Sequence, residues 1–242
     1  MWLWTISWRK LKIGLVLGAL VILMAVSMPS DKSEMPVLSY GLAGRTIVID
    51  AGHGGYDPGA IGRQTKIPEK KITLAISQRL AKLASQAGAM VVMARTEDAG
   101  LSDEGFQGKL IERKRQDLAR RVEKALRVKP DVYISIHGNA DPSPRWHGAQ
   151  TFYYFGSPPS KQLATCIQDE MVRILGNNNR KAKEAVFFIM ERTNMPTVTV
   201  EVGFLSNPDE EKLLIDELYQ SKVAYSIFSG TVKYFATREE TK

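Results

Sequence analysis

The chain has 242 residues, of which 44% are hydrophobic and 24% charged, a composition typical of a globular protein with a substantial core. Its net charge of +7 favours an anionic partner, such as membrane headgroups, nucleic acid or an anionic wall polymer. The basic residues lack interleaved aromatics, which argues against nucleic acid, and the single cysteine, Cys166, excludes an intrachain disulfide and a cysteine-based metal site.

The N-terminus carries an export signal. Arg9, Lys10 and Lys12 precede an uncharged apolar run over residues 13–28, the pattern of a secretory signal peptide or a signal-anchor. Small residues at 25–27 resemble a cleavage site, so cleavage and membrane anchoring both stay open. Because the positive flank stays inside, we expect the rest of the chain to be exported and to face the cell wall.

Four segments follow from this pattern. Residues 1–29 are expected to form the signal peptide or signal-anchor, and residues 30–44 a polar linker that contains prolines. Residues 45–236 are expected to form a single folded domain, and residues 237–242 a short tail.

Strands and helices alternate along the domain. Short apolar runs predict strands at residues 46–49, 90–93, 132–136, 149–155, 186–190 and 197–202. Apolar residues at helical spacing predict helices at residues 68–87, 110–128 and 160–175, one opening at Pro208, and a last one around residues 224–235. This alternation predicts an α/β fold, with a mostly parallel, mixed six-stranded sheet and helices on both faces.

Three predicted strands deliver a polar side chain to the same edge of the sheet. His53 follows the first strand, His137 follows the third, and Glu201 ends the strand over residues 197–202. Ligands bind at this edge in open α/β sheets, so we expect the side chains to converge. A lone histidine after a strand is more often a hydrogen-bonded structural residue, but several converging polar groups favour a functional site.

Glu69 joins this group from the helix that follows the His53 loop. The helix dipole favours a carboxylate in the first turn, which is one explanation for it. Glu69 nevertheless shares the apolar face of Ile72 and Ile76, at spacing i, i+3, i+7. A carboxylate that faces inward needs a cation or hydrogen-bond donors, so we expect Glu69 near His53.

Two histidines and a carboxylate leave an open position on a zinc ion (Zn2+), and a second carboxylate could then exchange protons with the reacting water. We therefore expect His53, Glu69 and His137 as metal ligands and Glu201 as general acid/base, although composition alone does not separate the roles of the two glutamates. His147 is a weak alternative ligand, because three ligands already complete such a site.

Two further residues are candidates for substrate positioning. Asn139 follows His137 at the end of its strand, and Arg95 follows the strand over residues 90–93. The simpler explanations are a turn residue that caps its own backbone for Asn139, and a solvated strand end for Arg95.

Five ordered blocks carry a family resemblance: IVIDAGHGGYDPGAIG, EKKITLAISQRL, VVMARTED, DVYISIHGNA and VTVEVGFLSNPDEEKLL. They resemble the zinc-dependent N-acetylmuramoyl-L-alanine amidases of the amidase-3 family over about residues 45–236. The resemblance implies zinc ligands at His53, Glu69 and His137 and a catalytic glutamate at Glu201. It also implies cleavage of the amide between the lactyl group of muramic acid and L-alanine in peptidoglycan.

Within the family, the chain is most similar to the sporulation and germination amidases of the CwlD type. This resemblance implies removal of peptides for muramic-δ-lactam formation in the spore cortex, in the intermembrane space of the forespore. It implies peptidoglycan as substrate, leaves room for an accessory protein that helps metal loading, and gives no role to nucleic acid.

Two other functions fit part of the pattern. A non-haem Fe(II) oxygenase also uses two histidines and one carboxylate, but the additional Glu201 and the exported location favour hydrolysis. A catalytically inactive module that binds the wall with the same fold would not need the complete set of site residues, which argues against it.

Overall fold

The computed structural model describes residues 41–239, which belong to one compact unit. The predicted signal peptide or signal-anchor (1–29) and most of the predicted linker (30–44) lie outside the described residues, as do residues 240–242 of the predicted tail. Within residues 41–239, no helix is long and apolar enough to cross a membrane.

Six strands form one mixed sheet in the order β2-β1-β3-β6-β4-β5. Their bounds are β1 Thr46–Ala51, β2 Met90–Met93, β3 Val132–Asn139, β4 Gln150–Tyr153, β5 Lys183–Glu184 and β6 Thr197–Phe204. Only the β4–β6 pair is antiparallel among these strands. The predicted mostly parallel, mixed six-stranded sheet is therefore confirmed.

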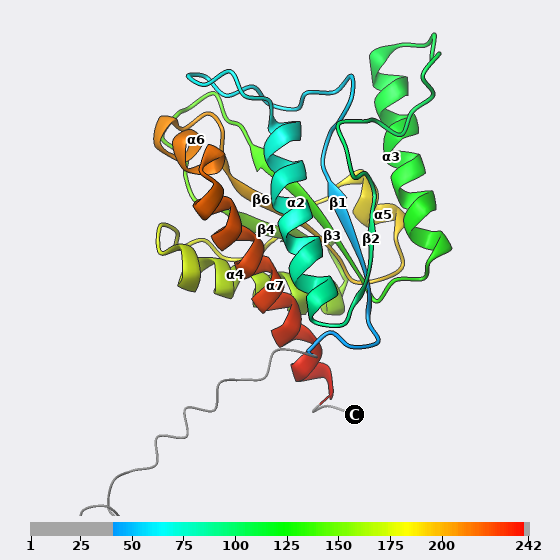
Figure 1. Cartoon of the computed structure of the whole chain (residues 1–242), viewed down its shortest axis with the longest axis vertical. Coiled ribbons are helices and arrows are strands. Elements are labelled where there is room, and N and C mark those ends of the chain that lie inside the picture. The colour runs from blue at the N-terminus through cyan, green and yellow to red at the C-terminus, as the bar shows by residue number, and fades with distance from the viewer. Residues whose placement is uncertain (1–40, 240–242) are drawn as a thin grey trace, which may run out of the picture. The chain divides into compact units, whose positions relative to one another are not determined.

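Helices cover both faces of this sheet (Figure 1). Their bounds are α2 Glu69–Gln86, α3 Leu110–Arg127, α4 Pro158–Leu175, α5 Phe188–Arg192, α6 Pro208–Ile215 and α7 Glu217–Glu239. Helices α2, α4 and α7 contribute to the larger core cluster, and α3 and α5 to the smaller one on the other face. Alternating side chains of β1 separate the two cores: Ile47 and Ile49 point into the larger, and Val48 into the smaller.

Local signals mark where helices α2 and α6 begin. Helix α2 starts after Pro68, and its buried stripe includes Glu69, Ile72 and Ile76, as their spacing predicted. Helix α6 is capped by Asn207, whose side chain accepts hydrogen bonds from the backbone N–H groups of residues 209 and 210.

The predicted strand over residues 186–190 is wrong. The segment instead enters the short helix α5, and the sixth strand is β5, a charged two-residue edge at Lys183–Glu184. Val186 is largely exposed, whereas Ile189 and Met190 are buried, so the apolar run is divided between solvent and core. A run of consecutive apolar residues does not distinguish these outcomes, because packing decides which side chains are covered.

Candidate active site

His53 stands on a strained turn directly after β1. Its φ of 61° lies in the left-handed region, which a residue with a Cβ adopts at a cost. The backbone carbonyl of His53 accepts a hydrogen bond of 2.7 Å from Nη2 of Arg121. On its ring, Nδ1 lies 2.9 Å from Oδ2 of Asp57, which directs Nε2 to the opposite side. Hydrogen bonds to the backbone carbonyl and to the imidazole of His53 therefore hold the turn in place.

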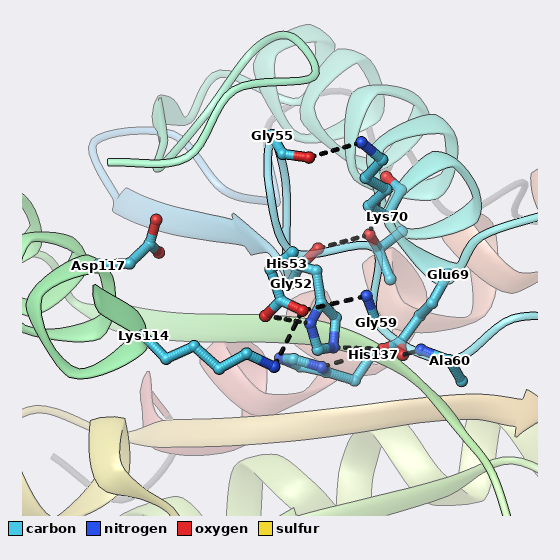
Figure 2. A network of polar contacts seen from close by, with 12 residues as sticks. Gly52, His53, Gly55, Gly59, Ala60, Glu69, Lys70, Lys114, Asp117 and His137 are labelled. Carbon is cyan, nitrogen blue, oxygen red and sulfur yellow. Dashed lines mark hydrogen bonds and ion pairs between the residues drawn. The ribbon is translucent and has the colours of Figure 1, made fainter. Parts of the chain in front are cut away.

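Glu69 joins the two histidines (Figure 2). Its Oε1 lies 3.0 Å from Nε2 of His53 and 3.1 Å from Nδ1 of His137. The same carboxylate accepts backbone hydrogen bonds from Gly138, at 2.9 Å, and from Ala60, at 2.8 Å. Both oxygens of Glu69 are thus engaged, and the side chain is almost completely buried.

Two glycines let the backbone approach these side chains. A Cβ on Gly52 would overlap the imidazole of His137, and a Cβ on Gly59 would lie 2.5 Å from Oε2 of Glu69. Gly59 also has a φ of +67°, a conformation that disfavours side chains. The glycine-rich sequence around His53 is therefore a steric requirement of the site.

The donor set fits a metal cation. One ligand atom from each of His53, Glu69 and His137 lies within 4.8 Å of the other two. Burial lowers the pKa of His53, but its hydrogen bonds to Asp57 and Glu69 outweigh burial and raise that pKa to about 9. Burial raises the pKa of Glu69, and its hydrogen bonds to His137 and His53 more than reverse this and hold the pKa below its usual value. The pocket thus favours positive charge at the point where the three side chains meet.

Glu201 lies beside this cluster with a different environment. Its Cα pairs in register with that of His137 across β3 and β6, so both side chains point to the same face of the sheet. Its Oε2 is buried and has no hydrogen-bond partner within the described residues. Burial raises the pKa of Glu201 to about 7. A carboxyl with this pKa can take up and release a proton near neutral pH.

A cleft of about 250 Å³ brings the candidate residues together. His53, His137 and Glu201 line it on the sheet side. Leu118 of α3 and Phe188 of α5 line it on the apolar side. The cleft is therefore lined by polar candidate residues and by apolar side chains, a combination that is typical of small-molecule sites.

A buried ionic network that the sequence-based prediction did not include lines part of the cleft. Arg121, only 2% exposed, donates to the carboxylates of Asp50 and Asp117 and to the backbone carbonyls of Ala51 and His53. Asp50 also accepts hydrogen bonds from Tyr133, at 2.9 Å, and Ser135, at 3.2 Å.

A signal for this network was present in the sequence. Arg121 lies on the same helical stripe as Leu118, Val122 and Ala125, and a cation at such a position must be paired if it is buried. The second missed residue, Asp57, follows His53 by four positions and belongs to the same glycine-rich turn.

None of the three secondary candidates belongs to the His-Glu-His cluster. Arg95 is 4% exposed, so the simpler explanation of a solvated strand end is wrong. Its guanidinium donates to the backbone carbonyls of Ala51, Gly52 and Lys70, among others, which does not fit direct substrate positioning. The structure places Asn139 at the end of β3, where its carbonyl accepts from the N–H of Leu205. His147 lies on an exposed loop outside the His-Glu-His cluster.

Sequence comparison agrees with this geometry. A model of the amidase-3 family, described as N-acetylmuramoyl-L-alanine amidase, matches residues 47–233. The germination-specific N-acetylmuramoyl-L-alanine amidase of Bacillus subtilis (strain 168) is 40% identical over 233 residues, 95% of this chain and 97% of that protein. The amidase LytC of the same strain is 34% identical over 196 residues, 80% of this chain and 36% of LytC.

Solved structures show the same fold. The CwlD amidase from Clostridioides difficile, solved in complex with the GerS lipoprotein, has 38% identity and a TM-score of 0.78, over 80% of this chain and 99% of that one. An N-acetylmuramoyl-L-alanine amidase from Clostridium difficile 630 has 32% identity and a TM-score of 0.72, over 80% of this chain and 98% of that one.

Proposed function

The chain belongs to the N-acetylmuramoyl-L-alanine amidase family, and from that premise we propose that it hydrolyses the amide between the lactyl group of muramic acid and L-alanine in peptidoglycan. Its biological role is peptide removal for muramic-δ-lactam formation in the spore cortex. The similarity to a germination-specific relative along nearly the whole length of both chains supports this role.

The proposed cofactor is one zinc ion held by His53, Glu69 and His137. The observation that carries this assignment is the convergence of two imidazoles on one carboxylate oxygen, at 3.0 and 3.1 Å. This donor set suits zinc and leaves a coordination position for substrate. When bound, zinc would supply Lewis acidity to the amide carbonyl and to the attacking water.

The two glutamates have different roles in this proposal. Two backbone N–H groups orient the carboxylate of Glu69, and its Oε1 faces both imidazoles, where a shared cation would replace the contacts between them. Glu201 has an unpartnered buried oxygen and a pKa of about 7. Its carboxylate accepts a proton from the attacking water and then donates it to the nitrogen of the leaving L-alanine.

The residues around the ligands prepare the site. Asp57 accepts a hydrogen bond from Nδ1 of His53, which fixes the ring and leaves Nε2 toward Glu69. The apolar wall of Leu118 and Phe188 keeps bulk water from the reacting groups, which strengthens the electrostatic interactions there. The complete set of these residues supports an enzyme over a wall-binding module without activity.

The setting of the enzyme is also proposed. Its substrate is peptidoglycan, so we place the domain outside the cytoplasm, facing the cell wall in the intermembrane space of the forespore, either secreted or held at the membrane by residues 1–29. The GerS lipoprotein in the complex of the C. difficile CwlD amidase supports an accessory protein as a second partner.

Product analysis tests the proposed reaction. The protein is incubated with zinc and purified peptidoglycan, with Glu201→Gln as control, and the soluble products are identified by mass spectrometry. We expect free peptides that begin with L-alanine from the wild type and none from the variant. Products cleaved at a glycosidic bond or within the peptide would reject the proposal.

A further inference from the structure

A second hollow has lining residues separate from those of the catalytic cleft, and the proposed chemistry does not use it. It has a volume of about 640 Å³, within the range of ligand-binding pockets. Its lining residues come from two loops, and we call it the Trp146 groove: Ser143, Arg145, Trp146, His147, Asn179 and Arg180.

Trp146 is the prominent feature of the groove. Its side chain is 54% exposed, and the guanidinium of Arg180 lies over its ring at 5.7 Å from the ring centroid. An indole presents a large apolar face together with a polar N–H, so an exposed one suits a ligand that is apolar on one side and polar at its rim. The pyranose ring of a sugar has this character, with C–H groups on its faces and oxygens at its edge.

The loop that carries Trp146 is fixed by side chains from elsewhere in the fold. Arg63 donates to the carbonyl of Pro142, at 2.9 Å, and Asn207, the cap of α6, donates to the carbonyl of Pro144, also at 2.9 Å. Arg180 donates to the carbonyl of His147, at 2.7 Å. A loop held in this way presents its side chains without a large entropy loss on binding.

The charged side chains that line the groove favour a ligand with hydrogen-bond acceptor oxygens. None of the six is acidic, and Arg145 and Arg180 bring positive charge. Acetamido carbonyls, hydroxyls and the lactyl carboxylate of a cleaved muramic acid are acceptors of the required kind. The groove is therefore complementary to a glycan that is neutral or anionic.

Neighbouring strands connect the groove to the catalytic site. Its loop joins β3, which carries His137, to β4, which starts at Gln150. Gln150 pairs in register with Glu201, so these two side chains point to the same face of the sheet. Nη1 of Arg180 in turn donates to the side chain of Gln150, at 3.0 Å. Gln150 therefore neighbours Glu201 on the sheet and bonds to Arg180 of the groove.

We propose that the Trp146 groove binds the β-1,4-linked glycan strand next to the muramic acid whose amide is cleaved. This inference rests on the proposed function, because the glycan is bonded to the group that reacts at Glu201. Trp146 stacks on one sugar ring, while Arg145 and Arg180 donate to its substituents. The groove would hold the polymer in register with the cleft.

Intrinsic fluorescence tests this assignment directly. The other tryptophans of the chain are Trp2, Trp4 and Trp8, so a protein of residues 38–242 has Trp146 as its single indole. This unit contains the described cores, and the C. difficile 630 amidase matches it along 98% of its own length, which shows that such a domain folds alone. The probes are an N-acetylglucosamine hexasaccharide and peptide-free peptidoglycan glycan strands.

We expect a saturable change in Trp146 fluorescence with both glycans. In calorimetry, Trp146→Ala should weaken glycan binding about 10-fold, as loss of a central aromatic contact does, and Trp146→Phe should weaken it less. Phe155→Ala removes an aromatic side chain that is 70% exposed and lies outside the groove, so it should bind as the wild type does.

Three results would overturn the assignment. They are the absence of a saturable signal with either glycan, unchanged glycan affinity in a folded Trp146→Ala variant, and binding of a free stem peptide in place of glycan. The glycans contain no scissile amide, so binding does not depend on turnover. Amidase activity is measured on the same protein, and an active enzyme that does not bind glycan rejects the groove alone.

Discussion

Replacement of Arg121 by methionine should destabilise the domain strongly, although Arg121 has no proposed role in the reaction. The variant keeps most of the side-chain volume but removes the guanidinium. The carboxylate of Asp50, which is 1% exposed, then keeps its hydrogen bonds to Tyr133 and Ser135 but loses its cation. The carbonyl of His53 also loses its donor.

The expected magnitude follows from this geometry. Removal of one partner of a buried ion pair costs about 3–5 kcal/mol, because the other charge stays buried without compensation. A domain of this size is stable by about 5–15 kcal/mol, so the variant loses a large part of its stability. For about 200 residues, such a loss lowers Tm by roughly 6–20 °C.

Urea denaturation followed by circular dichroism measures the effect, with chelator present so that metal binding does not contribute. The double variant Arg121→Met, Asp50→Asn is the matched control, because it removes the guanidinium together with Asp50, the more deeply buried of its two carboxylate partners, and should recover part of the loss. A loss below about 1 kcal/mol for Arg121→Met, in the range of surface ion pairs, would refute the view that this network supports the turn of His53.

Three further predictions concern the site itself. Glu201→Gln should stabilise the metal-free domain at pH 8. Because the folded-state pKa of Glu201, about 7, exceeds the ordinary value of 4.5, the wild type loses up to about 3 kcal/mol of unfolding free energy as pH rises from 4.5 through 7, and the variant does not. Equal pH profiles of the two proteins in urea denaturation would contradict this. Asp57→Asn should weaken zinc affinity about 10–100-fold in a competition titration with a chromogenic chelator, because Nδ1 of His53 loses its carboxylate acceptor; unchanged affinity would remove Asp57 from the site. Gly52→Ala should displace the ring of His137 and reduce zinc affinity and turnover together, whereas Gly105→Ala, where a Cβ meets no atom within 4 Å, should change neither.

The sequence predicted the site where backbone topology alone determines position. His53, His137 and Glu201 end neighbouring strands, so the parallel order of the sheet brings them to one edge whatever the details of packing. Glu69 was found because its spacing placed it on the buried stripe of α2. Position did not separate the roles of Glu69 and Glu201, which depend on hydrogen bonds from residues distant in the sequence.

Predictions failed where tertiary contacts overrule local preference. Arg95 is expected at the surface by residue type, yet it is buried because carbonyls of the β1 turn and of α2 accept its hydrogen bonds. The edge strand β5 consists of Lys183 and Glu184, which carry no apolar signal. Its pairing with β4 is set by neighbouring structure and not by its own sequence.

The assignment of Glu69 as a metal ligand and of Glu201 as the proton-transfer group is the central claim. It is tested most directly by measuring zinc content together with amidase turnover in Glu201→Gln and Glu69→Gln. The structure predicts that Glu201→Gln retains one zinc per chain and releases no peptide, because Glu201 contributes the proton transfer and not a ligand. Glu69→Gln should lose zinc and activity together. A Glu201→Gln variant that still releases peptides, or a Glu69→Gln variant that binds zinc as the wild type does, would contradict the assignment.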